Sequence, residues 1–90
     1  MARAIRAATP PDLLPHQADL DALFRFYAVL ARAKGDAVTA SDVHDAWSAW
    51  TLNRGEGHEA VVPFEALAPD AQVEDEPFVE AIRTAVRETQ

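Results

Sequence analysis

The sequence contains no cysteine, which excludes disulfides and thiolate metal sites. It has only three glycines, and no P-loop, glycine-rich dinucleotide turn, GxSxG or HExxH motif occurs in it. The turn Gly55-Glu56-Gly57 is too short and too acidic to hold a phosphate. These absences argue against the common enzyme classes, and we expect a non-catalytic protein without a cofactor or a bound metal.

Long apolar segments are also missing. No apolar run approaches the roughly 20 residues that a membrane-spanning helix needs. Near the N-terminus, Ala7-Ala8-Thr9-Pro10-Pro11-Asp12 replaces the apolar core of a secretory signal peptide. We therefore expect a cytoplasmic protein with no membrane partner.

Positive charge is scarce, since eight Lys and Arg oppose fifteen Asp and Glu for a net charge of −7. Binding to a nucleic-acid polymer requires clustered basic residues and is not expected. Between Gly55 and Ile82 the sequence has eight acidic residues and no Lys or Arg. This stretch is either a solvated face or a docking surface for a basic partner.

The apolar residues that are present follow helical spacing. Leu20, Leu23, Tyr27 and Leu30 recur at steps of three and four and predict a helix over about 17–34. Gly35 supplies its left-handed stop. Phe26 and Val29 widen the apolar surface beyond one stripe. This helix is therefore expected to be contacted on two sides, by other helices or by a second subunit, which makes self-association through 17–34 one prediction.

A second helix is predicted over about 40–54, ending at Gly55. Thr39 fits its N-cap and Asp42 the reciprocal acid of a capping box, with Val38 and Val43 at the positions of a hydrophobic staple.

Later prolines divide the rest of the chain. Pro63 and Pro69 suit the start of short helical turns near 63–75, and Pro77 opens a last helix over about 77–88. Residues 1–16 read as an N-terminal arm: Met1 to Ala8 can form two helical turns, but Pro10-Pro11 ends them. No segment alternates with period two. We predict an all-α, single-domain bundle of three main helices over residues 17–90.

The binding candidates lie on the second helix. Trp50 aligns with Val43 and is expected in the core, whereas Trp47 lies one turn from His44 and is the better site candidate. Trp47 also has a purely structural interpretation, because the chain has few other large side chains. Arg54 can supply positive charge to an anionic ligand or complement the helix C-terminus.

A metal site is the weaker alternative. His44 and His58 could meet only through tertiary folding, and with Glu65 they would form a two-histidine, one-carboxylate site. Isolated histidines more often satisfy a local hydrogen bond.

The segments Val43-His44-Asp45-Ala46-Trp47 and His58-Glu59-Ala60-Val61-Val62-Pro63-Phe64-Glu65-Ala66-Leu67, with Gly55 between them and Asp75 following, resemble the RyR domain, the repeat named after ryanodine receptors. The resemblance covers about residues 43–85. The pattern looks most like that of stand-alone proteins of actinobacteria and their phages.

The resemblance implies a helical, non-enzymatic module that binds a nucleotide-like ligand. It places Trp47 in the pocket, with His44 one turn before it and His58, Pro63 and Phe64 as walls. The family's Gly-Trp-x-Tyr-Gly element is missing and Glu59 stands where proline is usual, so a smaller pocket is expected. The competing hypothesis is a homo-oligomeric or adaptor domain without a small ligand.

Overall fold

A computed structural model describes residues 1–14, 20–55 and 59–89. All regular structure in these ranges is helical, with no strand. The helices are α1 (Ala2–Ala8), α2 (Leu20–Lys34), α3 (Ala40–Asn53), α4 (Pro69–Val73) and α5 (Glu76–Glu88), and the 3-10 turns are η1 (Pro11–Leu13), η2 (Gly35–Ala37) and η3 (Phe64–Ala66). The predicted all-α class is confirmed.

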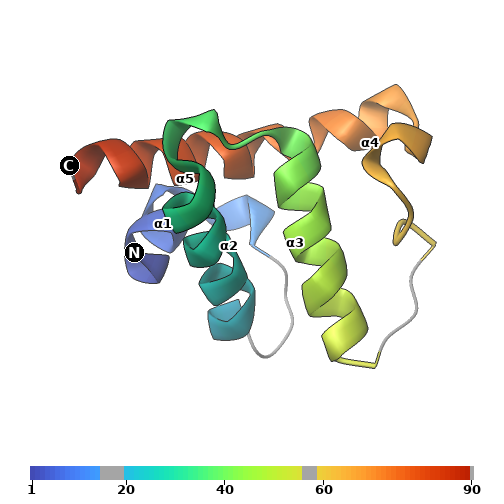
Figure 1. Cartoon of the computed structure of the whole chain (residues 1–90), viewed down its shortest axis with the longest axis horizontal. Helices are drawn as coiled ribbons and strands as arrows, with labels where there is room; N and C mark the ends of the chain where they lie inside the picture. Colours follow the sequence, from blue (N-terminus) through green and yellow to red (C-terminus); the bar gives the residue numbers. More distant parts are fainter. Residues whose placement is uncertain (15–19, 56–58, 90) are drawn as a thin grey trace.

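Three predicted helices correspond to α2, α3 and α5, with ends that agree within one residue wherever the structure describes them. Residues 17–19, the expected start of the first helix, lie outside the described residues. The predicted turns near 63–75 correspond to η3 and α4. In Figure 1, α2 and α3 lie side by side and α5 runs across one end of both.

The N-terminal segment differs from expectation. Residues 2–8 form α1, which packs against both α2 and α5, and Ile5 on this helix is fully buried. The main helices of the described chain therefore number four instead of three. Ile5 is the one large apolar side chain of this helix, so the sequence gave little indication that the helix packs against the core, yet Ile5 is part of that core. Leu14, after η1, packs against the same core.

The ends of α2 and α3 follow the predicted signals. The Thr39 hydroxyl accepts a hydrogen bond from the Asp42 amide at 3.2 Å, and the Asp42 carboxylate accepts one from the Thr39 amide at 2.9 Å, so the capping box is confirmed. Gly35 and Gly55 adopt φ of 55° and 74°, the left-handed conformation that ends each helix. Local sequence therefore fixes where α3 begins and ends.

The core lies where α1, α2, α3 and α5 meet. Its fully buried large side chains include Phe24 and Tyr27 from α2, whose rings meet edge to face at 5.5 Å. Trp50 is only 3% exposed, which confirms its expected place in the core. Ile82 of α5 is fully buried beside them. This core holds α2 and α3 together. Two side chains from each helix, Leu23 and Tyr27 from α2 and His44 and Trp47 from α3, line the cavity described next.

Candidate functional site

A cavity of about 280 Å³ opens beside α3. Its described lining comes from η1, α2, α3, α4 and α5 and from the segments next to α4, and consists of Leu13, Leu23, Tyr27, His44, Trp47, Ala60, Leu67, Ala71, Glu74, Asp75 and Phe78. Most of these side chains are apolar or aromatic, with a few polar groups among them. This composition is typical of a site for a small organic molecule, and the volume is near the lower end of the usual range.

His44 and Trp47 form the α3 wall of the cavity. They are one turn apart, and their rings stack with centroids 5.7 Å apart and an interplanar angle of 26°. His44 is buried, whereas Trp47 is half-buried. The helix thus holds the imidazole in place and leaves part of the indole to the cavity.

The hydrogen bonds of His44 fix its orientation. The ring atom Nε2 lies 2.7 Å from the carbonyl oxygen of Val62. A carbonyl oxygen only accepts, so Nε2 carries a proton and donates it. The other nitrogen, Nδ1, then faces the Asp75 carboxylate, with Oδ2 at 3.9 Å.

Asp75 lies at the start of α5 with its side chain 16% exposed. Burial raises the pKa of its carboxyl group to about 6; His44 opposes this rise, and the neighbouring Glu74 and Glu76 add to it. The effect of burial exceeds that of the imidazole. The carboxyl group therefore changes its charge near neutral pH.

Tyr27 and Phe78 supply an aromatic wall from α2 and α5. Their ring centroids are 5.7 Å apart with an interplanar angle of 41°. Burial, and to a lesser degree the charge of Asp75, raises the pKa of the Tyr27 hydroxyl above its ordinary value. The phenol is therefore neutral and is suited to contact a ring or an apolar group.

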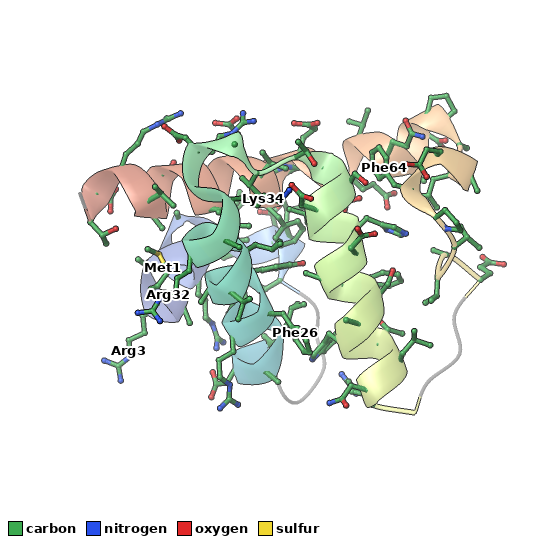
Figure 2. The ribbon with its side chains drawn as sticks, viewed as in Figure 1. Met1, Arg3, Phe26, Arg32, Lys34 and Phe64 are labelled. Carbon is green, nitrogen blue, oxygen red and sulfur yellow. The ribbon has the colours of Figure 1, made fainter. Side chains whose placement is uncertain are left out.

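Three other predicted site residues, Phe64, Pro63 and Arg54, do not line this cavity. Phe64 does not line it but packs behind His44 with ring centroids 6.1 Å apart, and Figure 2 shows it between α3 and the α4 segment. Pro63 lines a separate shallow groove with Val62 and Leu52. The Arg54 guanidinium lies 4.7 Å from the Trp50 ring centroid, away from this lining. Phe64 thus supports the cavity wall from behind, through its contact with the His44 ring.

His58 lies outside the described residues. Among those described, no group of three His, Cys, Asp or Glu is arranged to hold a metal ion. No helix in the same part of the chain is long and apolar enough to cross a membrane.

A family model described as "Domain of unknown function (DUF7701)" matches residues 1–87. The chain belongs to this family. The match begins before α1 and ends within α5, so the DUF7701 domain includes the N-terminal helix as well as the cavity. No curated protein and no solved structure matches the chain.

Sequence reasoning about this DUF7701 chain did not select Tyr27, Asp75 or Phe78 as site residues. Tyr27 and Phe78 fit the apolar stripes of their helices, and only the fold shows that their rings reach a cavity. Asp75 lies in an acidic run, Glu74-Asp75-Glu76, where nothing in the sequence distinguishes the middle residue. The one hint in the sequence was that Asp75 follows Val62-Pro63-Phe64 in the segment that resembles the RyR domain.

Proposed function

We propose that this chain is a non-catalytic module that binds a small ring-containing ligand in the cavity beside α3. The observation that carries the proposal is the half-buried indole of Trp47, held against His44 and facing a cavity with further aromatic lining. Such a face can stack on a planar ligand, and the neighbouring polar groups can orient it.

The chemistry of the site supports binding over catalysis. The one histidine in the lining is buried and already donates a hydrogen bond to the backbone of Val62. The described lining contains no serine, threonine or lysine, so the hydroxyl and amine nucleophiles of those residues are not found there. What the arrangement offers is shape, aromatic surface and a titrating carboxyl group.

The RyR resemblance favours a nucleotide-like ligand. Of such a ligand, our proposal includes only the base and makes no claim for the sugar or the phosphate. A nucleobase would stack on Trp47, as bases do on aromatic side chains in other proteins. The cavity is small, in keeping with the missing Gly-Trp-x-Tyr-Gly element.

The test uses the position of the two tryptophans. In a Trp50→Phe variant the remaining indole is that of Trp47, so its fluorescence reports on the cavity alone. We expect planar compounds from a panel of nucleobases, nucleosides and aromatic fragments to quench this fluorescence and to raise the melting temperature of the unmodified protein.

Trp47→Ala is expected to weaken binding about tenfold or more, since stacking contributes on the order of 1–3 kcal/mol. Leu52→Ala is the matched control, because Leu52 is on the same helix, 60% exposed, and outside this cavity. Equal binding by both variants, with helicity retained, would remove Trp47 from the site.

An alternative is self-association through α2. Val29 on this helix is 64% exposed, which favours the alternative, whereas Phe26 is half-buried and packs against the core. A single exposed valine is ordinary on a monomer surface. We therefore rank the ligand-binding module first.

A further inference from the structure

The cavity combines aromatic rings with acidic groups. Trp47, Tyr27 and Phe78 contribute rings, and Glu74 and Asp75 contribute carboxyl groups to the same lining. Glu74 is exposed, whereas Asp75 is mostly buried. The acidic groups thus extend from the solvent-exposed surface into the interior of the cavity.

His44 is the basic side chain in the described part of this lining. No Lys or Arg is among the described residues around the cavity. The sequence has none in 7–24, 35–53 or 55–82, the stretches that supply all of the lining except Tyr27. Figure 2 shows the labelled basic residues Arg3, Arg32 and Lys34 on the side of α1 and α2, away from α4. The phosphate of a nucleotide would therefore meet negative charge here.

The Asp75 carboxylate has an incomplete set of partners. Among the described residues, its one ion-pair contact is His44 Nδ1, at the long distance of 3.9 Å. The imidazole does not fully compensate for burial, which keeps the pKa of Asp75 at about 6. Above that pH a mostly buried negative charge faces the cavity, and in the described part of the chain its counter-ion is the distant His44 ring alone.

We infer that the cavity selects an organic cation, an ammonium or amidinium group on an aromatic or apolar body, with the charge at Asp75 and the body against Trp47. Carboxylates and aromatic faces both attract such cations, and the attraction is stronger where water is partly excluded. This inference rests on the proposed function. It specifies that the ligand carries a positive charge and not the negative charge of a phosphate.

Three probes of matched size test the charge preference: benzylamine, benzyl alcohol and benzoate. Binding is measured at pH 7.5, where Asp75 is ionised, through Trp47 fluorescence and the indole signals in NMR spectra. We expect benzylamine to bind about tenfold more tightly than benzyl alcohol, and benzoate to bind most weakly.

The Asp75→Asn variant is expected to weaken the binding of benzylamine about tenfold, so that benzylamine no longer binds more tightly than benzyl alcohol to the same variant. Asp70→Asn is the matched control, because it makes the same change in net charge at an exposed α4 residue outside the cavity lining. It should retain the preference.

Equal binding of all three probes, or a charge preference that persists in Asp75→Asn, would overturn this inference and leave the proposed ligand-binding function standing. Binding by none of the probes or of the planar panel would overturn both.

Discussion

At the scale of single residues, the contact between His44 and Asp75 links the two halves of the site. His44 belongs to α3 and donates to the backbone at Val62, while Asp75 begins α5. The pair thus joins three segments that are distant in the sequence. Its polar groups are largely removed from water, so the protonation state of Asp75 affects folding stability.

The raised pKa of Asp75 predicts a specific pH dependence. The folded state holds this proton more tightly than the unfolded chain, whose carboxyl group has the ordinary pKa of 3.8. The contribution of Asp75 to stability is therefore most favourable below about pH 4, and it is lost as the pH rises through about 6. By linkage the loss is on the order of 3 kcal/mol, from a pKa rise of roughly two units at about 1.36 kcal/mol each.

Urea denaturation of Asp75→Asn and of the unmodified protein at several pH values measures this effect. The variant lacks the ionising group, so its stability relative to the unmodified protein should increase between pH 4 and 7. Asp70→Asn should show no such trend. A relative stability that falls with pH would mean instead that an ionised His44–Asp75 pair stabilises the fold.

At the scale of secondary structure, α3 was predictable because its sequence carries its own end signals. Thr39 and Asp42 set its start, Gly55 sets its end, and both tryptophans are on it. The sequence also indicated the division of roles between buried Trp50 and half-buried Trp47. It did not indicate the attachment of α1, because seven residues with one large apolar side chain give no readable stripe.

The burial of Ile5 predicts that α1 is part of the folding unit. Ile5→Ala should destabilise the protein by about 2–4 kcal/mol, the usual loss for a large aliphatic side chain in a packed core. In a domain of this size that is a large fraction of the total stability. Urea denaturation followed by circular dichroism gives the value.

Arg3→Ala is the control for Ile5→Ala, because it alters an exposed residue of the same helix. It should change stability by less than about 0.5 kcal/mol. A similarly small effect of Ile5→Ala would show that residues 2–8 are a loosely attached arm, as the sequence pattern suggested.

At the scale of the whole molecule, helical periodicity and the lack of period-two alternation predicted the fold class, but the cavity depends on long-range packing. His44 meets Asp75 across 31 positions of sequence, and no local pattern encodes that distance. The same holds for Tyr27 and Phe78: their spacing assigns both to a core, and only the fold shows that their rings also reach the cavity. The sequence thus allowed us to predict which helices these residues belong to, but not that the folded chain brings them together at one cavity.

The oligomeric state distinguishes the two functional hypotheses at this scale. We expect light scattering at high concentration to give the mass of one chain, 9.8 kDa, because the exposed apolar surface on α2 is small. Val29→Glu should then leave the mass unchanged. A dimer that Val29→Glu dissociates, while Val73→Glu does not, would favour self-association instead; Val73 is a suitable control because it is also 64% exposed.

The chain ends lie on the same side of the molecule as α1, across from α4 (Figure 1). A tag, fluorophore or surface linker attached at either end would therefore project away from the α4 side. Immobilising the protein by either end is thus a practical way to test compounds against the proposed site while the α4 side stays open to solution.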